Sequence, residues 1–345
     1  RTAEARLASG DLSRAQKEFQ VAGTIYGGIE DVTDETTGVA FSLSATRIIS
    51  DGGILDATIR AKVFSAESAL QDFRVTQEDR AYALGSIWIE LEKYQALKNL
   101  IDSRLDVLDP LIEQLEQVAD AGLGDVSSVA AAQRTVATIK LSAANISEGL
   151  AQAELNYINA FGSLPSNLPY DAGYISENVP NTVSEEMVRK APMILSKYAT
   201  YQATLENVLA AHAKDKFNIG FEARAMRPFA GSEYDSDESI GLVARKTLFS
   251  GGIYELEIKE AEALVNDSTE QIRAAYREGE RVIRTAQQNI TAMDRAIKLS
   301  RNNSEVTKDE ITYLRQQLII GGSTLDSVLS AEARLYEAEN KETSF

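Results

Sequence analysis

The side chains that most often do chemistry are scarce in this chain of 345 residues. It has no cysteine and one histidine, His212, which lies in LAAHAKDK with no partners at the spacing of a catalytic triad or a zinc site. The stretch YDSDE, Tyr234 to Glu238, has carboxylates for a cation but lacks the glycine and terminal glutamate of a calcium loop. We therefore predict no enzyme, no metal site and no cofactor. We interpret His212 as structural or solvent-exposed and YDSDE as an acidic surface loop.

The composition excludes further classes of protein. The formal net charge is −17, whereas binding to nucleic acid depends on clustered lysine and arginine, and no such cluster occurs. No uninterrupted apolar run approaches the roughly 20 residues of a membrane-spanning helix. Tracts rich in Ala, Gln, Glu and Leu, with only six prolines, predict a helix-rich protein. The first residues lack the layout of a signal peptide, and the chain starts and stops inside predicted helices, so we expect both ends to be trimmed.

Two double glycines, in IISDGGILDATIRA and TLFSGGIYELEIKE, mark an internal repeat. Gly52 and Gly53 lie 199 residues before Gly251 and Gly252, and in both places a strand-like stretch changes into a helix-like one. The same offset pairs Leu43 with Leu242, Leu100 with Leu299, Leu115 with Leu314, Gly122 with Gly321 and Ser128 with Ser327. Chance leucine matches do not hold two glycine landmarks at one separation, so we interpret the chain as two repeats.

Each repeat contains one very long predicted helix, 54–121 in the first and 253–320 in the second. Apolar residues follow alternate three-four spacing along them, which is a heptad seam, and at 1.5 Å per residue each helix would be roughly 100 Å long. Gly122 and Gly321 then predict a turn, because glycine readily adopts positive φ. The pattern restarts in return helices at 125–161 and 324–345, the second one truncated.

Four segments ahead of the double glycines alternate apolar and polar residues, at about 19–29, 37–49, 216–226 and 239–249. In the third, Phe217, Ile219 and Phe221 point one way, whereas Lys216, Asn218 and Glu222 point the other. About ten residues with one apolar face is the pattern of a transmembrane β-strand. The pattern alone fits equally well a pair of hairpins packed on a soluble helical domain.

Two repeats of hairpin, double glycine, long helix, glycine tip and return helix resemble the TolC-like outer-membrane factor family. The resemblance is carried by IISDGGI and LFSGGI at the strand-to-helix junctions, by VADAGLGDVSSVAAAQ and LIIGGSTLDSVLSAEARLYEAE at the helix tips, and by ELNYINAFGSLP. It implies a mixed α/β membrane protein, in which three protomers give four strands each to one outer-membrane β-barrel that continues into a periplasmic α-helical barrel. The double glycines would then be the bends between barrel and tunnel. Repeat one would span 1–161, a linker 162–186 would lie at the tunnel waist, and repeat two, with a helix at 187–214, would span 187–345.

The resemblance also implies the function: the passive exit duct of a type I secretion or tripartite efflux system in the bacterial outer membrane. The implied partners are two further copies of the chain, outer-membrane lipid, a periplasmic adaptor protein, and an inner-membrane ABC or other transporter, with no nucleic acid. The implied cargo is protein or small molecule. The alternative is a soluble or peripheral coiled-coil scaffold, which would use the same heptads without needing four amphipathic strands.

The family's gate lies at the helix tips, where this sequence departs from the family pattern. Serines stand where many members have tip aspartates, at Ser327 and Ser330, and Ser323 stands where an arginine is expected. The nearest acidic residues are Asp120, Asp125 and Asp326, which we predict as gate candidates, the alternative being that they cap helices or face solvent. We expect the tips to move and to dock the adaptor through small residues at the turns: Gly122, Ser127, Gly321, Gly322 and Ser323.

Overall fold

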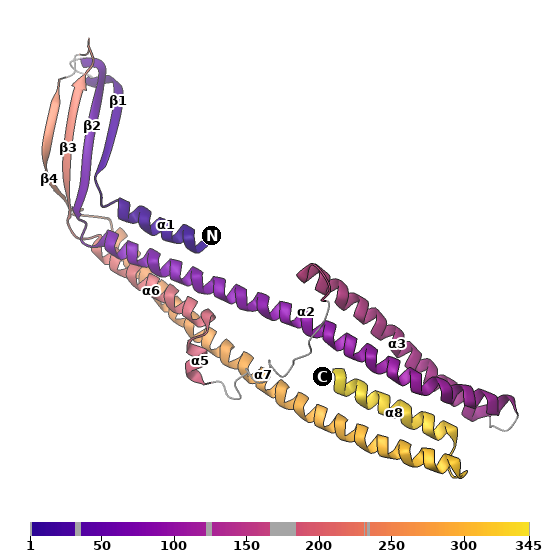
Figure 1. Cartoon of the computed structure of the whole chain (residues 1–345). Helices are drawn as coiled ribbons and strands as arrows, with labels where there is room; N and C mark the ends of the chain where they lie inside the picture. Colours follow the sequence, from indigo (N-terminus) through magenta and orange to yellow (C-terminus); the bar gives the residue numbers. More distant parts are fainter. Residues whose placement is uncertain are drawn as a thin grey trace. The chain divides into compact units, whose positions relative to one another are not determined.

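The computed structural model describes residues 2–31, 36–121, 126–165, 184–230, 232 and 235–344, and shows a mixed fold of long helices and one open four-stranded sheet (Figure 1). This confirms the predicted mixed α/β class. The part of the chain that the structure describes has no helix with both the length and the hydropathy needed to cross a bilayer. The chain divides into two compact units: Arg1–Gln77 with Val183–Glu280, and Glu78–Thr182 with Arg281–Phe345.

The sheet belongs to the first unit and is antiparallel throughout, in the order β1-β2-β3-β4. Its strands are β1 (Gln20–Asp31), β2 (Thr36–Ser50), β3 (Asn218–Pro228) and β4 (Asp237–Arg245). The end of β4 differs from the expected boundary at 249, because Arg245 pairs with Asn218, the first residue of β3, and later residues have no partner strand. Leu248 and Phe249 accordingly lie outside the strand and are 92% and 88% exposed.

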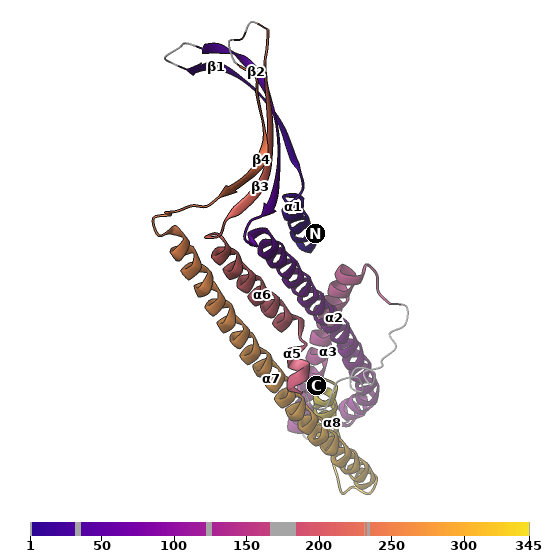
Figure 2. The same ribbon diagram turned by 90° about the vertical axis from the view of Figure 1, so that its left-hand side faces the viewer.

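Helices of the first unit meet the sheet at one end (Figure 2). Those nearest the sheet are α1 (Thr2–Ala15), α6 (Pro192–Ala213) and the first parts of α2 (Ile54–Asp120) and α7 (Ile253–Ile319). The short helix α5 (Glu185–Arg189) lies at the end of α6 that is remote from the sheet. Small side chains let α2 and α6 approach closely: the Ser68 hydroxyl lies 3.2 Å from that of Ser196, which donates to Asp72. Both helices also have buried alanines, among them Ala57 and Ala61 on α2 and Ala199 and Ala203 on α6.

The second unit contains the remaining parts of α2 and α7, together with α3 (Val126–Phe161) and α8 (Leu325–Ser344). The predicted seam of α2 supplies its core, since Leu91, Ile101 and Leu108 are at most 1% exposed. One hydrophobic cluster joins α2, α3 and α8 through Ile101, Ile139 and Leu329, and a second joins α7 to α8. Helix α2 continues through Pro110. Of the expected linker 162–186, residues 166–183 lie outside the described residues, and α5 begins within its last positions.

Candidate functional site

One face of the sheet is apolar and exposed. Residues that pair across antiparallel strands point to the same side, so the registers place Val21, Ala45, Ala223 and Ile240 in one row across the four strands. The large exposed members include Ile25 at 66%, Leu242 at 70% and Ile240 at 77%. We call this set the apolar face: Val21, Ile25, Val39, Phe41, Leu43, Ile219, Phe221, Ile240 and Leu242.

The opposite face of the same sheet is polar. It contains Thr24, Ser42, Thr46, Glu222, Arg224, Ser239 and Arg245, which alternate with the members of the apolar face. Glu222 and Arg245 form a two-pronged ion pair across β3 and β4. A sheet with exposed apolar side chains on one side and charged ones on the other fits a boundary between lipid and water.

The three residues predicted to face lipid lie at the start of β3. Ile219 and Phe221 are partly buried members of the apolar face, whereas Phe217 comes just before the strand and is 56% exposed. Sequence reasoning missed the larger contributions of Ile25, Ile240 and Leu242. Alternation was the available signal, but it is weaker in β4, because the polar face there also contains an apolar residue, Val243, opposite to Leu242.

Both strand-to-helix junctions contain glycines at positive φ. The angles are 71° and 101° at Gly52 and Gly53, and 64° and 84° at Gly251 and Gly252, values that favour glycine. The first junction is also capped: Asp51 is buried, and its carboxylate accepts from the backbone N–H of Gly53 at 2.9 Å and of Leu55 at 2.6 Å. Sequence reasoning missed this cap, although an aspartate just before a helix is its usual signal.

The α7–α8 tip is a closed turn with a capped helix on each side. Gly321 has φ 77°, and the N–H of Gly322 donates to the carbonyl of Gln317 at 2.8 Å, which ends α7 in the manner of a Schellman motif. Thr324 caps α8: its hydroxyl accepts from the N–H of Ser327 at 3.3 Å and lies 2.8 Å from the Ser327 hydroxyl. Ser327 thus makes a local cap contact. Ser323 is partly buried, and its hydroxyl lies 3.4 Å from the Thr324 carbonyl.

The gate candidates are only partly described. Asp326 lies in the first turn of α8 and is half-buried, and Asp120 is the exposed last residue of α2. Gly122 and Asp125 lie outside the described residues, and Ser127 is exposed in the first turn of α3. Beside these ends, a hollow of about 380 Å³ separates α2 from the α7–α8 tip. It is lined by Gln114, Gln117, Val118, Ala121, Leu318 and Leu325.

A network of ion pairs links three helices of the second unit. Glu332 of α8 is 3% exposed and accepts from Arg104 of α2 at 3.4 Å and from Arg315 of α7 at 2.7 Å. Glu339, about two turns further along α8, accepts from the Nε of Arg104 at 3.0 Å and pairs with Lys308 of α7 at 3.0 Å. Helix α8 is therefore held by charge to both long helices. Sequence reasoning missed the network, because its members are far apart along the chain.

Solved structures with this arrangement exist, although no family model and no curated protein matches the sequence. The outer membrane protein VceC of the bacterial pathogen Vibrio cholerae matches with a TM-score of 0.78 at 16% identity, over 99% of this chain and 87% of VceC. CusC, solved in a study of transmembrane channel formation, gives 0.83 at 15% identity over 99% and 83%. The CmeC outer membrane channel of Campylobacter jejuni gives 0.77 at 13% identity over 99% and 78%.

The chain has the fold of bacterial outer-membrane channels. At the level of the fold, this outer-membrane channel architecture supports the resemblance to the TolC-like outer-membrane factors. CusC and CmeC are described as channels rather than enzymes, which agrees with the prediction that the chain is not an enzyme.

Elsewhere in the chain, the described residues offer no second site. Within the described residues, no group of three or more His, Asp or Glu side chains is placed to hold a metal ion. His212 is exposed in the last turn of α6. In the YDSDE stretch, Tyr234 lies outside the described residues, and Asp235 to Glu238 are exposed.

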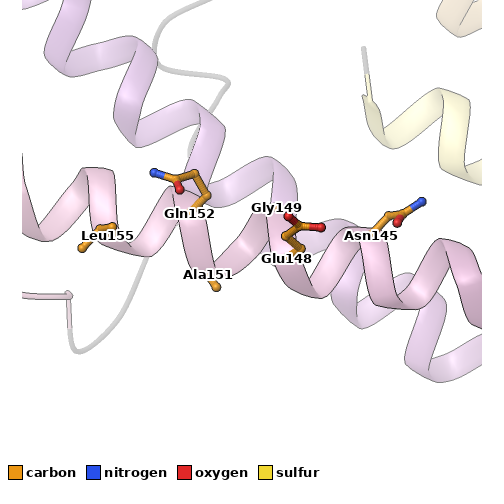
Figure 3. Close-up of a pocket in the computed structure, with 6 residues that line it drawn as sticks. All are labelled: Asn145, Glu148, Gly149, Ala151, Gln152 and Leu155. Carbon is orange, nitrogen blue, oxygen red and sulfur yellow. The ribbon is translucent and has the colours of Figure 1, made fainter.

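A shallow pocket of about 520 Å³ is lined by Asn145, Glu148, Gly149, Ala151, Gln152 and Leu155, all from α3 (Figure 3). Glu148 is the one carboxylate in this lining, and the lining offers it no catalytic partner.

Proposed function

We propose that this protein is one protomer of a trimeric exit duct in the bacterial outer membrane. The observation that carries the proposal is the exposed apolar face of a sheet whose other face is polar. Exposing such a face to water is unfavourable. In a bilayer the same face would form the outer wall of a barrel and contact the lipid tails.

The open edges of the sheet favour an assembly of several copies. Strands β1 and β4 each pair on one side only, so each leaves a row of backbone N–H and C=O groups without a strand partner. In hydrocarbon each unsatisfied group costs several kcal/mol, so a spanning sheet must close on itself. Pairing of β4 with β1 of the next copy closes it, and the polar face then lines the pore.

The duct would act by passive conduction. The channel fold supplies a path, and an inner-membrane ABC or other transporter, joined through a periplasmic adaptor, would supply both the cargo and the energy. The cargo would be a small molecule in tripartite efflux or a protein in type I secretion.

The experiment that tests this function is reconstitution in a planar lipid bilayer. We expect the chain to purify from membranes only with detergent, to have the mass of a trimer and to produce discrete conductance steps. In the variant Ile219→Arg, assembly and insertion should fall, since an arginine on the lipid side of a barrel costs about 2 to 4 kcal/mol near the midplane. A water-soluble monomer without conductance would instead support the coiled-coil scaffold.

The gate of the duct would lie at the helix tips. If Asp326 faces the channel axis, three copies converge, and together with Asp120 and Asp125 they make a narrow mouth that attracts cations. We predict that cobalt hexammine added on the tip side blocks single-channel current, and that Asp326→Ala weakens the block. Ser327→Ala, which changes the neighbouring cap without changing charge, is the control. Equal block in wild type and Asp326→Ala would remove Asp326 from the gate.

The tips would also be the docking surface for the adaptor. The sequence has small residues at both predicted turns, namely Gly122, Ser127, Gly321, Gly322 and Ser323, which would leave room for another helical hairpin. Because the chain has no cysteine, Ser127→Cys and Ser323→Cys give unique cross-linking positions. We expect cross-links to the adaptor, and we expect export to stop when neighbouring tips are locked together. Export at the normal rate through locked tips would contradict the gating role.

A further inference from the structure

At the helix end of the apolar face, two cations lie against aromatic rings. The guanidinium carbon of Arg47 is 5.2 Å from the centre of the Phe19 ring, which packs edge-to-face on Phe221 with ring centres 5.9 Å apart. Arg47 is the cross-strand partner of Phe221. Just after the end of β4, the ammonium nitrogen of Lys246 lies 5.8 Å from the centre of the Phe217 ring, which comes just before β3. We call these five residues the cation–aromatic border.

Both cations stand at the same limit of the apolar face. On β2 the face-side residues run from Val39 to Ala45 without charge, and the next one is Arg47. On β4 they run from Ile240 to Ala244, and Lys246 follows directly after the strand ends at Arg245. The last uncharged face-side residues, Ala45 on β2 and Ala244 on β4, pair with Ala223 and Ile219 of β3. The apolar stretch on β4 therefore ends four residues nearer the helices than the one on β2. An offset of this kind is expected where tilted barrel strands cross one membrane plane.

The charge on the border is incompletely neutralised. Among the described residues Arg47 has no ion pair, and Lys246 has one long contact, 3.6 Å to Asp215. The other end of the apolar face differs, because Arg227 there is paired with Glu238 on the adjacent strand. The helix end thus presents positive charge beside exposed rings, whereas the far end presents a matched pair.

We propose that the cation–aromatic border binds the phosphate of glycerophospholipid headgroups in the leaflet on the helix side of the sheet, with preference for anionic phosphatidylglycerol. The inference rests on the proposed function, since it requires the apolar face to lie in a bilayer. Arginine donates two parallel hydrogen bonds to a phosphate, and aromatic rings at the headgroup level contact the first methylenes of the acyl chains. A headgroup satisfies both parts of the border, whereas a free anion would leave the rings exposed.

Native mass spectrometry of the detergent-solubilised full-length trimer, titrated with short-chain phosphatidylglycerol, tests the inference. We expect Arg47→Gln and Lys246→Gln each to raise the apparent Kd about fivefold, because this is the change in affinity that loss of one basic residue causes at an anionic membrane surface. Arg47→Lys should retain most of the affinity because it keeps the charge. Arg227→Gln is the matched control and should bind as wild type does. Phosphatidylcholine should bind more weakly than phosphatidylglycerol to the wild type, with a smaller difference in the double variant.

The outcomes separate this inference from the proposed function. If wild type and the double variant Arg47→Gln/Lys246→Gln both conduct in bilayers but bind phosphatidylglycerol equally, the border is not a lipid site and the duct stands. Displacement of the lipid by millimolar inorganic phosphate would also overturn the inference, in favour of a free-anion site. If the wild type neither inserts nor conducts, the proposed function itself fails.

Discussion

At the scale of single residues, the two strand-to-helix junctions have the same backbone but different surroundings. Gly52 and Gly251 both have positive φ. A Cβ added at Gly52 would lie 2.7 Å from the Cβ of Lys216 and 3.1 Å from the carbonyl oxygen of Ala213, whereas one added at Gly251 would meet nothing within 4 Å. The repeat therefore provides two comparable sites: both glycines have positive φ, but only Gly52 is sterically crowded.

Alanine should consequently be worse at the first junction than at the second. We expect Gly251→Ala to cost about 1 to 2 kcal/mol, the penalty of a left-handed conformation for a residue with a Cβ. Gly52→Ala should cost more, since the end of helix α6 must also move. The thermal unfolding midpoint of the detergent-solubilised trimer measures both changes. Equal midpoints for the two variants would show that the contact with Lys216 is not constraining.

A buried carboxylate in α2 adds a dependence on pH. Glu92 is 8% exposed, and its Oε1 has no hydrogen-bond partner among the described residues. Desolvation by burial raises the pKa of Glu92 above its usual value. The ionised form therefore destabilises the folded state above the raised pKa, and this penalty disappears as the pH falls toward the unfolded value of about 4.3.

Replacing this carboxylate should stabilise the protein only at higher pH. We expect Glu92→Gln to raise the unfolding midpoint at pH 7, and the difference from wild type to vanish near pH 4. Glu90→Gln, at an exposed position two residues earlier, is the control and should change little. A Glu92→Gln variant that is less stable than wild type at pH 7 would indicate that the carboxylate has a partner in the assembled protein.

At the scale of elements, the heptad pattern and the charge network differ in how far the sequence reveals them. The seam of α2 was predictable because Leu91, Ile101 and Leu108 follow a local periodicity, and they are buried as expected. Glu332 has no such signal: within its own helix it looks like one more surface charge, and only the packing of α8 between α2 and α7 buries it. Long-range partners of this kind are invisible to periodicity.

Removing Arg104 should loosen α8 from the first long helix. Glu332 and Glu339 would keep Arg315 and Lys308 but lose the cation that joins them to α2. We expect Arg104→Met to destabilise the protein by up to about 3 kcal/mol, because two poorly exposed carboxylates lose a partner. Arg334→Met, which breaks the exposed pair with Glu310, should cost less than about 1 kcal/mol. Similar losses in chemical unfolding of the two variants would show that burial adds nothing to the network.

At the scale of the whole molecule, the order of strands and helices was predictable from alternation, heptads and the double glycines. The pairing of the two hairpins into a single sheet was not, because β2 and β3 are joined through residues more than a hundred positions apart. That pairing is what assembles one continuous apolar face from four separate alternating segments. The closed barrel and its three protomers remain predictions.

Fluorescence quenching by lipid can show directly which face of the sheet touches the bilayer. Ile25 and Thr24 are adjacent residues on the apolar and polar faces of β1, and Leu242 and Gly241 are the corresponding pair on β4. Each would be replaced by a single cysteine that carries a fluorophore, in the full-length protein reconstituted in vesicles. Brominated lipid should quench the fluorophore at positions 25 and 242 and leave it largely unquenched at 24 and 241. Equal quenching within each pair, or none at any position, would contradict a lipid-facing sheet and with it the outer-membrane duct.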